Sequence, residues 1–424
     1  MGRLRPSLVN SQRQRLQLAT SCLHRGFQLV AEGLPAARHI PVNLTVNLER
    51  LRTNYQIIRE QLNGGEAAAV VKANGYGLGC VEVSTALAQQ GCHRFFVAQL
   101  AEGLLLREAI DDVEIHVFNG AMPGTVDDLI EHRLIPALNS LEQIERWAQA
   151  AKERQQELPA TIHIDTGMNR TGLGADETAV LIDEAWRLDA LNVVHVMSHL
   201  GSADVADSTQ PAEQLRRFEA HRRQLPMGFA SLANSAGIFL GPAYHFDLVR
   251  PGVALYGGSP HPDQKNPMQQ VVTLTAPILQ VRNVVVGDYV GYAATHAVDR
   301  PGKVATIPVG YADGFLRSAS NSAVAYVGSV QVPIIGRVSM DLITLDVTEV
   351  ADSELHSGAP VELIGDQVPI DEAARRAGTI SHEMLAALGA RYKRSYVGEL
   401  RSPARAAGER PERPGERSEQ ERRG

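Results

Sequence analysis

The stretch AAAVVKANGYGLG, residues 67–79, is an apolar run that ends on a lysine and leads into a cluster of glycines and polar residues. A short apolar run, a polar or glycine cluster and then an amphipathic stretch with helical spacing together predict one β-α unit. This unit occurs eight times before residue 258. The runs are AAAVVKA (67–73), RFFVAQ (94–99), EIHVFNG (114–120), LIPALNS (134–140), ATIHIDTG (160–167), VVHVMSH (193–199), FASLANS (229–235) and FDLVRPG (246–252).

Eight parallel strands, each followed by a helix, over little more than 200 residues predict a (β/α)₈ barrel of the TIM type. Because the runs are short, an open doubly wound sheet remains the alternative. Beyond residue 270 the apolar period changes from 3.6 to two, which predicts an antiparallel β domain. We expect a disordered leader over 1–40, the barrel over 41–270, a C-terminal β domain over 271–400 and a disordered tail over 401–424. A strand near residue 41 is expected to cross from the β domain into the barrel.

Composition narrows the function classes. The 424 residues carry a net charge of -7, which argues against a nucleic-acid partner, and no apolar stretch reaches the length of a membrane span. Cys22, Cys80 and Cys92 have no metal-type spacing, so neither a disulfide framework nor a zinc site is predicted. The first 31 residues contain arginines and no acid, which fits either a leader or a transit peptide. We expect a cytoplasmic protein that acts on small molecules.

The polar residues that end the strands are the candidates for chemistry, since barrel active sites lie at the C-terminal strand ends. Lys72 follows five apolar residues, and partial burial there would lower its pKa and make its amine a nucleophile toward an aldehyde. A solvated lysine or a salt bridge is the plainer interpretation. An imine-forming lysine can bind a substrate directly or anchor pyridoxal phosphate.

A phosphate site would favour the cofactor. NSAG, with Asn234 and Ser235, sits at an expected helix start, and RPGVALYG adds the backbone amide of Gly252 at the last strand. Helix N-termini and the loops after the last two barrel strands commonly bind phosphate. A serine cap and a turn glycine are the plainer interpretations of the same residues. Together with Lys72, these segments favour pyridoxal phosphate.

Six motifs occur in one order: AVVKANGYGLG (69–79), IDTGMNRTGLG (164–174), LANSAG (232–237), LVRPGVALYG (248–257), VGYADG (309–314) and IGRVSMD (335–341). In this order and spacing the chain resembles pyridoxal-phosphate-dependent alanine racemases over about residues 41–397. The resemblance implies interconversion of L- and D-alanine by two bases. It also implies a head-to-tail homodimer whose sites combine the barrel of one subunit with the β domain of the other. Racemisation of serine or a broader range, a related decarboxylase or aldolase, and a non-catalytic cofactor-binding regulator are the alternatives.

The resemblance also implies roles for individual residues. Lys72 would hold the cofactor and act as one base. Arg250 would face the pyridine nitrogen and, as a pure donor, keep it unprotonated. The remaining cofactor-binding candidates are Tyr76, His199, Asn234, Ser235, Gly252 and Val253. Arg170 and the amide of Met340, with Asp341 beside it, would receive the substrate carboxylate.

Departures from the family pattern concern the second base and three lesser positions. In VGYAATHAV, residues 290–298, we align the family's catalytic tyrosine with His296, whose imidazole would exchange protons near neutral pH. Tyr292 and Tyr311 are the alternatives. The lesser positions are His163, where relatives have a lysine, Ser339, where they have a cysteine, and Tyr392, a weak candidate for a phosphate ligand.

Overall fold

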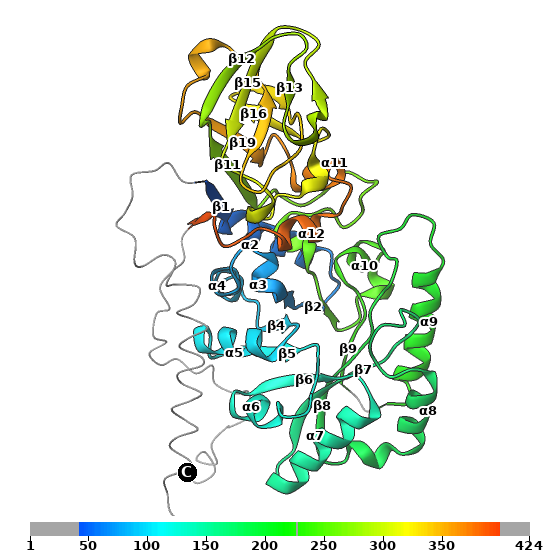
Figure 1. Cartoon of the computed structure of the whole chain (residues 1–424). Coiled ribbons are helices and arrows are strands. Elements are labelled where there is room, and N and C mark those ends of the chain that lie inside the picture. The colour runs from blue at the N-terminus through cyan, green and yellow to red at the C-terminus, as the bar shows by residue number, and fades with distance from the viewer. Residues whose placement is uncertain (1–41, 226–227, 399–424) are drawn as a thin grey trace, which may run out of the picture.

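The computed structural model describes residues 42–225 and 228–398 (Figure 1). The leader and the tail expected from the sequence lie outside the described residues. Within the described part, no helix is both long and apolar enough to cross a membrane.

All eight predicted runs form strands, and the strands close into a ring. β3 to β9 form one parallel sheet in chain order, and β10 pairs in parallel with β2. The N–H of Arg250 donates to the carbonyl of Ala233 (2.9 Å) beside β9, so the last gap closes. The barrel is confirmed, and the open sheet is wrong. The strands are β2 (Glu66–Ala67) and its continuation β3 (Ala69–Val70), β4 (Arg94–Val97), β5 (Glu114–Val117), β6 (Leu134–Leu138), β7 (Leu158–His163), β8 (Leu191–Met197), β9 (Phe229–Ser231) and β10 (Leu248–Val249).

Seven of the eight strands are followed by a helix on the outside of the ring. These helices are α4 (Cys80–Gln89), α5 (Leu100–Ala109), α6 (Val126–Glu131), α7 (Leu141–Arg154), α8 (Ala175–Asp183), α9 (Gln210–Arg222) and α10 (Ser235–Phe239). After β10 there is only the 3₁₀ helix η3 (Val253–Tyr256), which ends at Gly257 with φ of 92°. The helix α2 (Leu48–Glu60), which precedes the first strand, packs there instead, and its Asn54 side chain donates to the carbonyl of Leu255 (3.1 Å). The expectation of a helix after every strand is therefore wrong for the eighth.

The C-terminal part is built on strands, as expected. One six-stranded sheet has the order β17-β16-β19-β11-β1-β20, and a three-stranded sheet has the order β12-β15-β18. Pairing is antiparallel except between β1 and β20. The strands are β1 (Asn43–Asn47), β11 (Val272–Pro277), β12 (Gln280–Val284), β13 (Tyr289–Val290), β14 (His296–Ala297), β15 (Gly302–Ile307), β16 (Val324–Val327), β17 (Val330–Pro333), β18 (Ile343–Asp346), β19 (Pro360–Ile364) and β20 (Lys393–Val397).

β1 connects the two parts of the molecule. Our expected limits assigned it to the barrel, but it lies in the sheet of the β domain, and the chain then enters α2 and the barrel. The other domain limits stay predictions. The helices α11 (Ile370–Arg376) and α12 (Ser381–Ala386) lie between the β domain and the barrel (Figure 1). Most buried apolar side chains of both parts form one continuous core. This shared core fixes α12 against the C-terminal mouth of the barrel.

Candidate active site

A cavity of about 660 Å³ lies at the C-terminal ends of the barrel strands. Its second wall comes from the segment 259–266 and from residues 369–382 of the β domain, including α11 and α12. Nine residues proposed from the sequence line it together: Lys72, Tyr76, Arg170, His199, Asn234, Ser235, Arg250, Gly252 and Val253. The fold therefore gathers every barrel residue of the proposed site in one place.

Lys72 begins a strained turn. The next four residues, 73–76, all have φ between 53° and 61°, so the chain makes a left-handed turn directly after the lysine (α3, Lys72–Tyr76). Outside glycine, this conformation costs roughly 1–2 kcal/mol per residue. Tertiary contacts must hold it: the N–H of Ala73 donates to Glu102 Oε1 (2.6 Å) and the N–H of Cys80 to Asn74 Oδ1 (3.0 Å). Backbone strain of this kind is concentrated at functional sites.

The amine of Lys72 is half-buried, with Nζ 5.9 Å from the centre of the Phe118 ring. Burial lowers its pKa, the positive charge of Arg170 lowers it further, and Glu102 opposes both effects. A lowered pKa increases the neutral fraction of the amine near pH 7. The surroundings of Lys72 therefore favour the neutral form of the amine, which a nucleophile or a base requires.

Arg250 is almost fully enclosed, with 3% of its surface exposed. One terminal nitrogen donates to Ser231 Oγ, and the other donates to the carbonyl of Ser198. Its Nε–H has no partner among the described residues. Burial lowers its pKa to about 10, so the guanidinium remains charged at pH 7. A buried N–H without an acceptor is rare, which indicates that a ligand supplies one.

The opposite end of the cavity is a cluster of hydroxyl and amide groups. Ser235 Oγ accepts the N–H of Gly252 (2.9 Å) and that of Ala254 (3.3 Å). A side chain at residue 252 would bring its Cβ to 2.3 Å from the hydroxyl of Tyr76, so only glycine fits. Asn234 lines the cavity, but its Oδ1 accepts the N–H of Gly237 (3.0 Å) and caps α10. This arrangement can hold a phosphate group.

Two histidines stand near the charged groups. His199 lines the cavity, and burial together with the charges of Arg250 and Arg170 lowers its pKa well below the usual value, so the ring is neutral. His163 does not line the cavity; its Nδ1 lies 2.7 Å from Asn139 Oδ1. Burial and the charge of Arg250 lower the pKa of His163 to about 3. Both imidazoles thus act as neutral polar groups at pH 7.

The residues proposed from the β domain do not line the Lys72 cavity of their own chain. His296 is half-buried in β14, opposite Val290 of β13. Met340 is 53% exposed, and Asp341 forms an ion pair with Arg391 (2.8 Å). One chain therefore brings the barrel half of the proposed site together and leaves the other half at a distance.

His382 also lines the cavity, although it was not among the residues proposed from the sequence. It lies on α12, and its ring centre is 6.0 Å from that of Tyr76. Burial and the charge of Lys72 lower its pKa. No motif marked it, because only the docking of α12 on the barrel brings it to the site. Tyr392, our weak candidate, is buried elsewhere and does not line the cavity.

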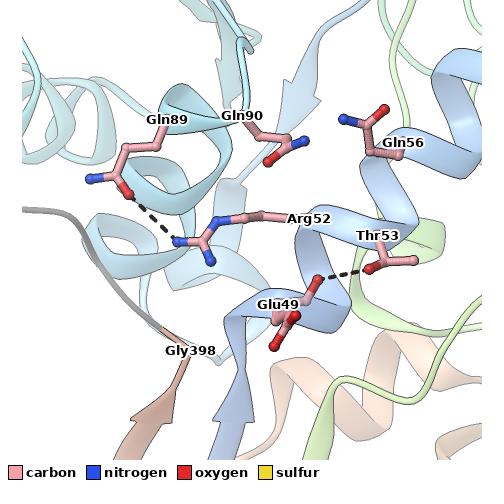
Figure 2. A pocket seen from close by; sticks show the side chains of 7 residues that line it. All are labelled: Glu49, Arg52, Thr53, Gln56, Gln89, Gln90 and Gly398. Carbon is pink, nitrogen blue, oxygen red and sulfur yellow. Dashed lines mark hydrogen bonds between the residues drawn. The ribbon is translucent and has the colours of Figure 1, made fainter.

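A second hollow of about 610 Å³ is lined by residues of α2, by the C-terminal end of α4 and by Gly398 (Figure 2). Its seven lining residues are Glu49, Arg52, Thr53, Gln56, Gln89, Gln90 and Gly398. None of these seven is a lysine, histidine or cysteine, and the Arg52 guanidinium contacts Gln89 Oε1 at 3.5 Å (Figure 2). The Lys72 cavity, by contrast, is lined by Lys72, His199 and His382, so it is the better candidate for proton-transfer chemistry.

Comparison with known proteins gives consistent matches. Residues 46–260 match the family model Alanine racemase, N-terminal domain, and residues 271–396 match Alanine racemase, C-terminal domain. The alanine racemase of Rickettsia peacockii is 45% identical, covering 83% of this chain and 98% of the relative. That of Rhodospirillum rubrum is 46% identical, covering 84% and 96%. The crystal structure of alanine racemase from Bartonella henselae with covalently bound pyridoxal phosphate is 38% identical, with a TM-score of 0.81 over 85% of this chain and 100% of that one.

Proposed function

Because the chain belongs to the alanine racemase family and interconverts L- and D-alanine with pyridoxal phosphate, we propose a role in that reaction for each group of the Lys72 cavity. The reaction, the cofactor and the fold expected from the sequence are confirmed. When bound, pyridoxal phosphate supplies the electron sink that makes the α-proton of the amino acid removable. The protein has to hold that group, orient the substrate and move protons on two faces.

The Nε–H of Arg250 in the cavity wall has no partner among the described residues, and this observation best supports placing the cofactor in the Lys72 cavity. A guanidinium only donates hydrogen bonds, so its partner must be an acceptor. An unprotonated pyridine nitrogen is an acceptor, whereas a protonated one is a second donor. Arg250 thus keeps the ring nitrogen unprotonated, which weakens the electron sink and restrains side reactions such as transamination.

The phosphate end is formed by groups that already lie together. Tyr76 and Ser235 offer hydroxyls, and beside them lie the backbone N–H of Val253 and that of Gly252, which donates to Ser235 Oγ in this structure. Asn234 contributes by capping the helix that positions Ser235. His382 closes this end from α12, next to Tyr76.

Lys72 is the base for one face of the substrate. Burial and the charge of Arg170 lower the pKa of this amine, which favours the neutral form that can accept the α-proton. Arg170, which lines the same cavity on an exposed loop, binds the substrate carboxylate. The carboxylate of Asp165 shapes that loop by accepting the N–H groups of Gly167 (2.9 Å) and Asn169 (2.8 Å). The position of the guanidinium thus depends on a local turn.

The base for the other face comes from the turn between β13 and β14. Two of its residues can transfer protons, His296 and Tyr292. Tyr292 is 71% exposed on a strained turn in which Ala293 and Ala294 have φ of 60° and 50°, whereas His296 is half-buried in a strand. Exposure on a strained turn favours Tyr292, although the imidazole has the proton affinity better suited to neutral pH. We therefore propose Tyr292 as the second base, with His296 as the second candidate.

A homodimer completes the site. In one chain, Tyr292, His296, Met340 and Asp341 do not line the Lys72 cavity, yet the reaction needs a base opposite Lys72. The same part of the β domain exposes apolar side chains, as expected of a surface that a second copy covers. They are Val285, Val286, Tyr289, Tyr292, Met340 and Leu342. In the dimer, the amide of Met340, with Asp341 beside it, faces the substrate carboxylate. A cytoplasmic location stays a prediction.

Hydride trapping tests the assignment of Lys72. The holoenzyme is reduced with borohydride and digested, and the pyridoxyl mass is located by mass spectrometry. The label is expected on the peptide that contains Lys72, with exposed Lys152 as an internal control that stays unlabelled. A label on another lysine, or the same labelling in Lys72→Ala, would exclude Lys72 as the anchor.

A further inference from the structure

A second group of chemically active side chains lies inside the barrel, away from the Lys72 cavity. Glu114 and His116 on β5 and His195 on β8 each offer one ligand atom, and these atoms all lie within 4.8 Å of one another. β6 and β7 separate β5 from β8 in the sheet, so the three side chains meet across the interior of the ring. Glu114 begins β5 and therefore lies at the N-terminal end of the barrel, opposite the mouth that carries Lys72.

Three of the four imidazole nitrogens of this cluster have no hydrogen bond among the described residues. His195 is 1% exposed, and both of its ring nitrogens are in this state. His116 is fully buried; its Nδ1 lies 3.0 Å from Thr161 Oγ1, and its Nε2 lies 3.7 Å from Glu114 Oε2, beyond hydrogen-bond distance. The surrounding rings offer no acceptor or donor: Phe229 packs edge-on to His195 at 5.8 Å, and Phe96 stacks on His116 at 4.5 Å. Leaving such groups unsatisfied costs roughly 1–3 kcal/mol each.

Charge and protonation suit a cation. An imidazole binds a metal ion through the lone pair of its neutral form, and neither ring nitrogen of His195 is engaged in a hydrogen bond among the described residues. Arg94 forms ion pairs with Glu114 (2.8 Å) and with Glu66. The net charge of these three side chains is therefore -1. A divalent cation beside Glu114 would meet one carboxylate and two imidazoles, and it would share that carboxylate with the guanidinium of Arg94.

We propose that Glu114, His116 and His195 form a binding site for a divalent transition-metal cation, with Zn²⁺ as the best match. Two imidazoles and one carboxylate are a common zinc ligand set, with water in the fourth position. Bonds of about 2.0–2.1 Å place tetrahedral ligands roughly 3.4 Å apart, so side-chain rotation has to shorten the longest separation by roughly 1.4 Å.

The neighbouring hydrogen bonds fit this assignment. A metal-binding histidine usually donates its other ring N–H to a polar group, and a ligating carboxylate is itself hydrogen-bonded. Thr161 supplies such a group for Nδ1 of His116, and Arg94 supplies one for Glu114. The Glu114 side chain is 43% exposed, which gives a cation an entry path from solvent. Cysteine spacing could not reveal this site, because its ligands are histidines and an acid on two strands. Its role is to tie β5 to β8 across the barrel.

Metal analysis of the full-length holoenzyme tests the proposal. The protein is treated with chelator, equilibrated with Zn²⁺ and freed of unbound metal, and zinc is measured by mass spectrometry. We expect about one Zn²⁺ per chain and an affinity at least tenfold lower in Glu114→Gln and His195→Gln. His356→Gln changes an exposed histidine of the β domain and should bind like the wild type. Co²⁺ in place of Zn²⁺ should give visible absorption that both cluster variants lose.

Thermal unfolding supplies a second readout. Zn²⁺ should raise the unfolding temperature of the wild type and of His356→Gln, but not that of Glu114→Gln. Glu114→Gln changes a half-exposed side chain to one of the same size, so we expect this variant to fold. It therefore tests the metal site even if His195→Gln fails to fold. Less than about 0.1 Zn²⁺ per wild-type chain, or equal affinity in the wild type and Glu114→Gln, would overturn the site.

Discussion

The N–H of Ala73, the residue after Lys72, donates a 2.6 Å hydrogen bond to Glu102 Oε1. The other oxygen of Glu102 accepts the N–H groups of Ala98 (2.8 Å) and Gln99 (3.1 Å) at the start of α5. One carboxylate therefore ties the left-handed turn behind the lysine to the end of the neighbouring strand. Glu102 is a positioning residue, since it acts on Lys72 through the backbone.

Glu102→Gln should impair catalysis without unfolding the protein. Glutamine has only one acceptor oxygen. Either the N–H of Ala73 or the N–H groups of Ala98 and Gln99 would therefore face the NH₂ group of the amide, and leaving an N–H without an acceptor costs roughly 1–3 kcal/mol of stability. We expect kcat to fall about tenfold while KM for alanine changes less, together with weaker hydride-trapped labelling of Lys72. Glu108→Gln, on the exposed face of the same helix, is the control. Unchanged kcat and labelling would remove Glu102 from this role.

Arg250→Lys should change the balance of reactions. Lysine keeps a positive charge but cannot supply two terminal donors and the Nε–H at once. We expect racemisation to fall about 10- to 100-fold, while pyruvate formed by transamination rises relative to it. Product analysis by chromatography measures both. If the ratio of the two products stays at the wild-type value, Arg250 does not control the ring nitrogen.

Tyr292→Phe and His296→Phe form a matched pair for the second base. In deuterated water, loss of Tyr292 should lower interconversion at least about 100-fold, while α-proton exchange of one enantiomer by Lys72 survives. His296→Phe should change interconversion less than about threefold, because a half-buried strand residue would not contact the substrate. Proton NMR with each enantiomer measures exchange and inversion separately. The opposite order of effects would assign the role to His296.

Hybrid dimers test whether two chains share a site. Lys72→Ala and Tyr292→Phe are each inactive in interconversion, but a mixed dimer would hold one site with both native residues. Equal mixing after dissociation and reassociation should restore about a quarter of the wild-type rate, because half of the dimers are mixed and each has one working site. Light scattering should confirm two chains per particle. No restoration despite mixed dimers would place both bases on one chain.

His163 should make stability depend on pH. Its folded pKa of about 3 lies below the usual 6.5, so below pH 6.5 the unfolded chain takes up a proton that the folded chain does not. The resulting stability is complete above pH 6.5 and is lost as pH falls toward 3, by up to about 1.4 kcal/mol per pH unit. Urea unfolding at pH 7 and pH 5.5 should show a smaller loss in His163→Gln. Equal losses would show that His163 does not contribute.

The barrel could be read from the sequence because each strand run is local. Val70 and Val196 are buried within runs that lead to Lys72 and His199, and apolar period and residue type in short segments determine both features. The missing eighth helix could not be read in this way. The β-α alternation predicted a helix after every strand, whereas α2 packs against η3 after the eighth strand.

His382 and Glu102 are clearer examples of residues whose roles could not be predicted from the sequence. Each lies in an ordinary helical sequence, and each acquires its role from a segment far away in the chain: Tyr76 for one and Ala73 for the other. The choice between Tyr292 and His296 as second base also depends on the tertiary structure. The motif spacing favoured His296, whereas the exposure of the side chain favours Tyr292.

The sequence by itself determined the fold, the family and the lysine, because strand period, glycine position and residue chemistry are properties of short segments. The tertiary structure decided three features: the Nε–H of Arg250 that has no partner among the described residues, the left-handed turn after Lys72, and the meeting of Glu114, His116 and His195 across the barrel. These depend on side-chain direction and on contacts between distant segments. Folding also changes the pKa values of buried groups such as Arg250, because only the folded chain excludes water from them.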